Sequence, residues 1–161
     1  MEKQLTSLVK ISKKFGTNDF AIAGGGNTSF KNKEFIWVKA SGTRLITITE
    51  EGFVQLYREK LNEISSCTYS QNLDERESQV KNDLYKSIVS RETSLRPSVE
   101  TSIHDLINYS FVVHTHPTLI NGLLCSQDAK KAFVELFGGK AVFIDYTDPG
   151  YTLFKKIEKL I

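Results

Sequence analysis

The stretch FVVHTHP at residues 111–117 constrains the fold and the function of this chain more than any other. Its aromatic and β-branched residues favour a buried strand, and Pro117 ends that strand because proline donates no hydrogen bond to a ladder. Side chains two positions apart on a strand share one face, so His114 and His116 can offer two imidazole nitrogens to one metal ion. Two ordinary core histidines would show the same spacing, and zinc needs further ligands. The stretch therefore marks a candidate metal site.

The composition is that of an ordinary globular chain. It has 161 residues, of which 40% are hydrophobic and 25% charged, enough for one domain with its own core. The net charge of +2 is spread along the chain, which argues against a dedicated nucleic-acid surface. Cys67 and Cys125 lie far apart, so they indicate no disulfide framework, and no apolar run approaches the ~20 residues of a membrane span. We expect a single cytoplasmic domain over residues 1–161, with no nucleic-acid or membrane partner.

The first part of the chain predicts a helix followed by antiparallel sheet. Apolar residues recur at helical spacing over residues 3–15, and Gly16 falls where a C-cap is expected. Residues 34–39 are typical of a strand buried on both faces, and residues 44–49 and 53–57 are consistent with two further strands. The short connections between these segments favour antiparallel pairing.

Helices predominate in the rest of the chain. The apolar stripe over residues 70–89 predicts an amphipathic helix with one face on the core. Ser98 is a natural N-cap for a following helix, in whose first turn Glu100 lies. After Pro117 we expect helices at 119–124 and 129–137, a strand at 141–145, a turn at 148–150 and a final helix at 151–160.

Three further features have both an ordinary and a functional explanation. The glycines at 24–26 leave the backbone free to approach a ligand, but a plain turn between strands would also use them. Glu100 is explained by the helix dipole alone, or it acts as a proton-transferring carboxylate. His104 lies one helical turn after Glu100 and could face the next strand. We expect His104 to pack or to support the site from behind, because residues 108–110 must reverse the chain between the helix and that strand.

Four motifs occur in an order and spacing that resemble the class II aldolase/adducin-like family. Together they are far more specific than any one of them. They are GNTS at 26–29, VKASG at 38–42, SVET at 98–101 with His104, and HTHP at 114–117. Residues 133–151 look more particularly like the aldolase domain of bifunctional rhamnulose-1-phosphate aldolase/alcohol dehydrogenase proteins. The resemblance implies a three-layer α/β/α domain with a mixed, mostly antiparallel central sheet.

The resemblance also implies roles for seven residues. His114 and His116 would bind Zn²⁺ or another divalent ion, and Glu100 would transfer a proton beside it. The substrate phosphate would be held by Asn27, Ser41, Gly42 and Ser98. The physical chemistry agrees, because a divalent ion stabilises negative charge on substrate oxygens and glycine-rich backbone forms anion-binding concavities. This chain has Val99 where the family often has a second serine, which removes one phosphate hydrogen bond.

The activity implied by the resemblance is cleavage of a phosphorylated ketose. Rhamnulose 1-phosphate, for example, would give dihydroxyacetone phosphate and an aldehyde. A pentulose-phosphate epimerase or a dehydratase of the same family remains an alternative, as does a non-catalytic adducin-like interaction domain. An interaction domain has no chemical need for Glu100, His114 and His116 together, which favours the enzyme.

Two expectations concern the whole protein. The family supplies a third metal histidine well downstream of the His-x-His motif, and this chain has no histidine after His116. Either the chain is a fragment of a longer protein, or its metal site is incomplete and is completed by water, by another subunit or not at all. We expect a fragment, truncated at its C-terminus. The resemblance also implies a homotetramer that binds a small sugar phosphate.

Overall fold

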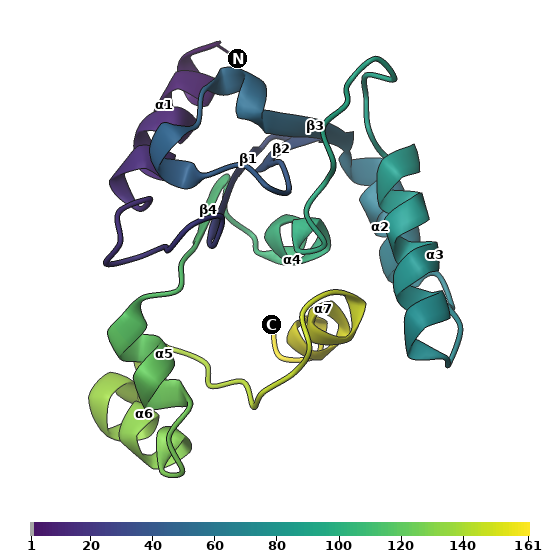
Figure 1. Ribbon diagram of the computed structural model, residues 1–161. Helices are drawn as coiled ribbons and strands as arrows, with labels where there is room; N and C mark the ends of the chain where they lie inside the picture. Colours follow the sequence, from purple (N-terminus) through teal and green to yellow (C-terminus); the bar gives the residue numbers. More distant parts are fainter. Residues whose placement is uncertain (1) are drawn as a thin grey trace.

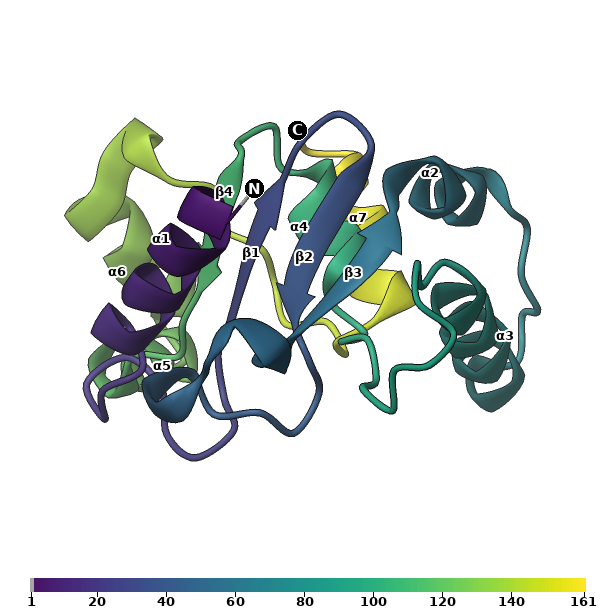
Figure 2. The same ribbon diagram turned by 90° about the horizontal axis from the view of Figure 1, so that it is seen from above.

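The structure is a computed structural model that describes residues 2–161. At its centre lies a four-stranded sheet, seen edge-on in Figure 1 and from above in Figure 2. In spatial order its strands are β3 (Phe53–Tyr57), β2 (Phe35–Lys39), β1 (Asn27–Lys31) and β4 (Phe111–His114). All three pairings are antiparallel, with Ser29 opposite Val38 and Asn27 opposite His114. The predicted strands at 34–39, 53–57 and 111–113 are confirmed to within a residue at each end.

Helices cover both faces of this sheet within residues 2–161. The α-helices are α1 (Glu2–Lys14), α2 (Arg58–Ser66), α3 (Leu73–Lys86), α4 (Thr101–Leu106), α5 (Thr118–Leu124), α6 (Ala129–Phe137) and α7 (Tyr151–Glu158). The 3₁₀ helices are η1 (Leu45–Thr47), η2 (Glu50–Gly52) and η3 (Gly138–Lys140). Figures 1 and 2 show α1 on one face and α4 on the other, with α7 beyond α4. This is the predicted three-layer arrangement. None of the helices in the described part is long and apolar enough to cross a membrane.

Two apolar clusters hold the layers together. Alternate residues of a strand face opposite sides of the sheet, so β2 contributes Ile36 and Val38 to one cluster and Trp37 to the other. The first cluster joins the sheet to α2 and α3 through Leu61, Ile64, Val80 and Leu84. The second joins it to α1 through Leu8, Phe30, Ile48 and Phe53. The expectation that β2 is buried on both faces is confirmed.

Two predicted strands are wrong. The segment 44–49 contains the 3₁₀ helix η1 (Leu45–Thr47) in place of a strand, because the buried residues Leu45 and Ile48 are three positions apart, which is the spacing of one 3₁₀ turn. Residues 141–145 form no strand and pair with none of the strands in the described part of the chain. Val142 is exposed in this segment. Its β-branched side chain favoured a strand in the sequence, but it does not pack in a sheet.

Other differences concern elements with weak apolar patterns. The sequence predicted neither β1, which reads NTSFK, nor α2, which reads REKLNEISS. The helix expected from residue 70 begins at Leu73, because the Asn72 side chain accepts a hydrogen bond from the backbone N–H of Glu75 at 3.1 Å. Helix α4 begins at Thr101, so Ser98 is not its N-cap and Glu100 occupies that position.

Candidate metal and active site

The site lies where β1 begins and β4 ends. Asn27, the first residue of β1, is paired with His114, the last residue of β4. The backbone N–H of His116 donates to the carbonyl of Phe20 at 2.7 Å, which holds the segment after β4 against the loop before β1. Gly26 has a φ of +71°, and a Cβ there would lie 3.0 Å from the carbonyl oxygen of His114. A side chain at position 26 would therefore be strained by this φ and would crowd the carbonyl of His114.

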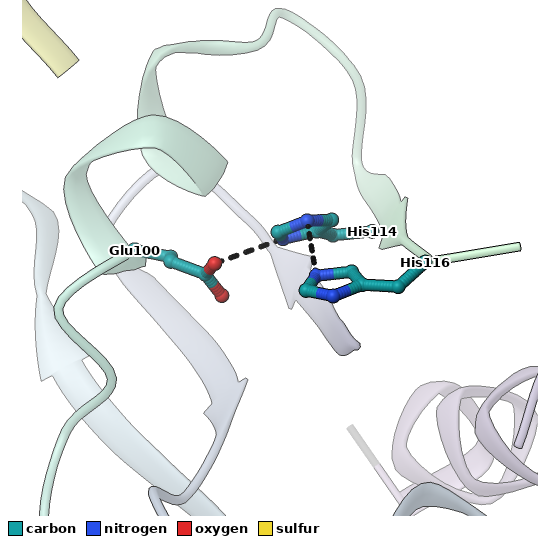
Figure 3. A group of neighbouring side chains, drawn as sticks. All are labelled: Glu100, His114 and His116. Carbon is teal, nitrogen blue, oxygen red and sulfur yellow. Dashed lines mark hydrogen bonds and ion pairs between the residues drawn. The ribbon is translucent and has the colours of Figure 1, made fainter. Parts of the chain in front are cut away.

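Glu100, His114 and His116 point toward one another (Figure 3). His114 Nδ1 lies 3.2 Å from Glu100 Oε1, and the Nε2 atoms of His114 and His116 are 2.9 Å apart. One ligand atom from each residue lies within 4.8 Å of the others. Two imidazoles and a carboxylate are the ligand set of several catalytic zinc sites, in which the fourth position stays open for water or substrate. The residues present therefore fit a divalent ion.

The charge states of Glu100 and His116 also suit a cation. Burial raises the pKa of Glu100, but the hydrogen bond and charge of His114 and the hydrogen bond of Asn27 outweigh it and lower the pKa to about 2. Burial lowers the pKa of His116, and the neighbouring His114 lowers it further, while Glu100 raises it. An ionised carboxylate and a neutral imidazole are the forms that bind a metal.

A turn before α4 aims Glu100 at β4. The backbone N–H of Glu100 donates to Ser98 Oγ at 3.2 Å, and the N–H of Thr101 donates to the Ser98 carbonyl at 3.1 Å. From the other side, Asn27 Nδ2 donates to Glu100 Oε2 at 3.3 Å. Asn27 is 1% exposed, and its Oδ1 has no hydrogen-bond partner in the described part of the chain. The structure thus brings Asn27, Ser98 and Glu100 together with the two histidines.

Ser41 and Gly42 lie in a separate turn just after β2. Gly42 has a φ of +84°, and the N–H of Thr43 donates to the Ala40 carbonyl at 3.2 Å, which closes the turn. The N–H of Ser41 donates to the carbonyl of Arg96 at 2.9 Å. This bond ties the turn to the segment that leads into Ser98. Two of the residues expected to hold phosphate are thus linked to a third through the backbone.

His104 packs behind the trio. It is buried, and its Nδ1 lies 2.8 Å from Ser29 Oγ in a hydrogen bond. Its ring centroid is 6.3 Å from that of His114, and it is not one of the three residues whose ligand atoms converge. Burial and the neighbouring His114 lower its pKa to about 3, although Glu100 opposes the shift, so the ring is neutral at pH 7. This placement suits a supporting residue.

Lys39 belongs to the VKASG motif at 38–42, but no role was predicted for it from the sequence. It is 3% exposed, and its Nζ donates to the carbonyls of Thr43 at 2.7 Å and Gly24 at 3.3 Å. Burial lowers its pKa, and the negative charge of Glu100 raises it. The sequence did contain a signal for a buried lysine, because Lys39 ends the strand FIWVK, whose other residues are apolar.

Comparison with known proteins defines the class. Residues 6–161 match the family described as Class II Aldolase and Adducin N-terminal domain. The chain belongs to this family. It is 32% identical over 143 residues to the uncharacterized oxidoreductase YuxG of Bacillus subtilis (strain 168), a match that covers 83% of this chain and 20% of that protein. The chain thus spans about a fifth of the length of this curated relative.

Solved structures agree on the fold. The N-terminal class II aldolase domain of a conserved protein from Thermoplasma acidophilum superposes with a TM-score of 0.80 and 28% identity, covering 96% of this chain and 73% of that one. An L-fuculose 1-phosphate aldolase superposes with a TM-score of 0.50 and 20% identity, covering 78% and 49%. The family and the fold class expected from the four motifs are therefore confirmed.

Proposed function

We propose that this chain carries the site of a metal-dependent aldolase that cleaves a phosphorylated ketose. The observation that carries this proposal is the convergence of Glu100, His114 and His116 within 4.8 Å. Membership of the class II aldolase and adducin family supports the same chemistry. Rhamnulose 1-phosphate, which would yield dihydroxyacetone phosphate and an aldehyde, is the substrate to test first.

The trio divides the chemical work. A divalent ion held by His114 and His116, with Glu100 beside it, would supply Lewis-acid stabilisation of negative charge on a substrate oxygen. Glu100 is the acid–base group of this proposal, because its carboxylate faces both histidines (Figure 3) and lies beside the place where they would hold the ion. Asn27 donates to Glu100 Oε2 and so keeps the carboxylate in this orientation. Asn27 is also paired with His114 across β1 and β4. The hydrogen bond from Asn27 therefore keeps the Glu100 carboxylate beside the His114 imidazole.

The phosphate of the substrate is proposed to lie against Asn27, Ser98 and the Ser41–Gly42 turn. The support is a chain of hydrogen bonds. The N–H of Ser41 donates to the carbonyl of Arg96, Ser98 Oγ accepts from the N–H of Glu100, and Asn27 Nδ2 donates to Glu100 Oε2. A phosphate held there would place the adjoining carbons of the substrate toward the trio. The identity of the metal as zinc and the homotetramer stay predictions.

Replacing Glu100 by glutamine tests the proposal. The change keeps the size of the side chain and removes its charge and proton affinity, so we expect cleavage of rhamnulose 1-phosphate to fall at least 100-fold in the presence of Zn²⁺. Release of dihydroxyacetone phosphate, coupled to its reduction by NADH, measures the rate. The matched control is Glu135→Gln on the exposed surface of α6, which should keep the wild-type rate.

The same variant separates two roles of Glu100. Bound metal without cleavage would show that Glu100 transfers the proton, whereas loss of both metal and cleavage would show that it is also a ligand. Full cleavage by the glutamine variant would refute the proposal. A wild-type chain that binds metal and epimerises a pentulose phosphate without cleaving any ketose would favour the epimerase, and one that binds no metal would favour an adducin-like interaction domain.

A further inference from the structure

We propose that the hollow at the end of β1, lined by Lys31, Lys33 and Arg58, is a second anion site that binds a phosphate group, either free or carried on a small molecule. Lys31 is the last residue of β1 and Asn27 is the first, so the hollow and the metal trio lie at opposite ends of this strand. The hollow is therefore separate from the substrate phosphate site proposed above, and it does not rest on the proposed function.

Separate segments of the chain meet at this hollow. Figure 2 shows the turn after β1 and the connection from α4 to β4 at the same end of the sheet, and the first residue of α2 completes the lining. The volume is about 270 Å³, and no carboxylate lines it in the part of the chain that the structure describes. Besides the three cations, the polar lining residues are Asn32, Asn108, Tyr109 and Ser110. The hollow can therefore offer hydrogen-bond donors from several sides to one anion.

Lys31 brings a buried positive charge to the hollow. It is 6% exposed, and its Nζ donates to the carbonyl of His104 at 2.5 Å. An ammonium group has three protons, and this carbonyl is the one acceptor of Lys31 Nζ within residues 2–161. Lys39, the other buried lysine, differs because its Nζ donates to three carbonyls. Lys31 therefore keeps donor capacity for a ligand, whereas Lys39 does not.

The charges around the hollow leave positive charge in excess. Asp105 is buried and pairs with Arg58, whose Nε lies 2.5 Å from Asp105 Oδ1. Lys31 forms no ion pair of its own among the described residues. Burial lowers the pKa of Lys31 to about 8, the charge of Asp105 opposes this shift, and the charge of Arg58 adds to it. The cations Lys31, Lys33 and Arg58 thus exceed the negative charge of Asp105 by two, which matches a phosphate dianion better than a single carboxylate.

Hydrogen bonds hold the walls of the hollow in place without a ligand. Arg58 Nη1 donates to the carbonyl of Asn32 at 2.8 Å, and the backbone N–H of Arg58 donates to the carbonyl of Glu34 at 2.9 Å. The backbone N–H of Lys31 donates to the carbonyl of Ser110 at 2.8 Å. These bonds join the turn after β1 both to α2 and to the segment before β4. A preorganised hollow loses little conformational freedom on binding, which favours affinity for a small anion.

The test is a titration with inorganic phosphate at pH 7, followed through the backbone amide signals of residues 31–33 and 108–110 in nitrogen-15 NMR spectra. We expect saturable shifts of these signals in the wild-type chain and at least tenfold weaker binding in Lys31→Met. Lys159→Met, the matched control, removes an exposed positive charge after α7 and should keep the wild-type affinity. Potassium chloride at the same ionic strength should cause no saturable shift, and equal shifts with chloride would overturn the inference.

A second variant keeps the test decisive if Lys31→Met does not fold. Lys33 is exposed and lines the same hollow, so Lys33→Met should leave the fold intact and weaken phosphate binding about threefold. Absence of saturable shifts in the wild-type chain would refute the site, as would wild-type affinity in a folded Lys31→Met. Glycerol 3-phosphate, titrated in the same way, separates the two sources of the group. Tighter binding than that of inorganic phosphate indicates a phosphate ester, and weaker binding indicates the free ion.

The inference and the proposed function fail in different ways. Phosphate-dependent shifts confined to the amide signals of Ser41 and Gly42 would support the proposed substrate site and refute the hollow. Saturable shifts at residues 108–110 that depend on Lys31 would support the hollow whether or not the chain cleaves a phosphorylated ketose.

Discussion

The sheet-centred part of the chain, residues 2–116, and the helices after Pro117 are built differently. In the first part, two apolar clusters join the sheet to α1, α2 and α3. In the second, the buried apolar residues among those described are Ala129 and Phe154, whereas Leu119 is 87% exposed and Tyr146 is 91% exposed. Figure 1 shows α5 and α6 standing apart from the sheet, while α7 lies against α4.

This contrast locates the chemistry. All the residues proposed for metal, proton transfer and phosphate lie between Asn27 and His116, on or beside the sheet that has its own core. Of the later helices, α7 contacts α4, whereas the segment as a whole leaves apolar side chains exposed. Stability and site geometry should therefore depend on the first part of the chain and be largely insensitive to exposed positions in the second.

The largest expected effect on stability comes from Leu84→Ala. Leu84 is 2% exposed and packs between α3 and the sheet, so its truncation should lower the free energy of unfolding by about 2–5 kcal/mol. The matched change Leu119→Ala on α5 removes a solvated side chain and should alter it by less than about 0.5 kcal/mol. Urea unfolding followed by circular dichroism measures both. Equal losses would abolish the contrast between the two regions.

A smaller effect is expected from the buried charge of Lys31. Burial lowers its pKa from 10.5 to about 8, with Asp105 opposing the shift. Between these values the unfolded chain binds more protons than the folded one, so the free energy of unfolding should rise from pH 8 toward pH 10.5. The contribution is on the order of 1–3 kcal/mol.

Lys31→Met isolates that contribution. The variant should show a flatter rise of stability between pH 8 and 10 than the wild type, measured by urea unfolding across the range. Lys159→Met, at an exposed position after α7, should keep the wild-type rise. A Lys31→Met profile parallel to that of the wild type would mean that the ammonium group of Lys31 is solvated in the fold.

The sequence predicted those elements whose apolar spacing matches their structure. The strands at 34–39 and 53–57 and the amphipathic helix α3 are of this kind. Strand β1 could not be predicted, because all five of its residues are buried although four are polar. Two of its polar side chains find partners distant in sequence, since Thr28 bonds Ser12 and Ser29 bonds His104. No local pattern contains that information.

The same distinction applies to the site. His114 and His116 were predicted from their local spacing, and Glu100 from its place in the motif that resembles the family. The structure shows that the ligand atoms of all three converge. The burial of Lys39 was not predicted, because a lysine at the end of a strand ordinarily reaches solvent. The carbonyls that accept its hydrogen bonds, those of Gly24 and Thr43, lie outside its strand. The direct link between Asn27 and Glu100 likewise depends on how α4 docks on β1.

The most direct test of the central claim is a titration of the chain with Co²⁺, followed by visible absorption at pH 7.5. If Glu100, His114 and His116 form one metal site, the wild-type chain binds one ion, and His114→Ala and His116→Ala each weaken binding at least 100-fold while Glu135→Gln leaves it unchanged. Binding of equal strength in the wild type and in both histidine variants would contradict the account.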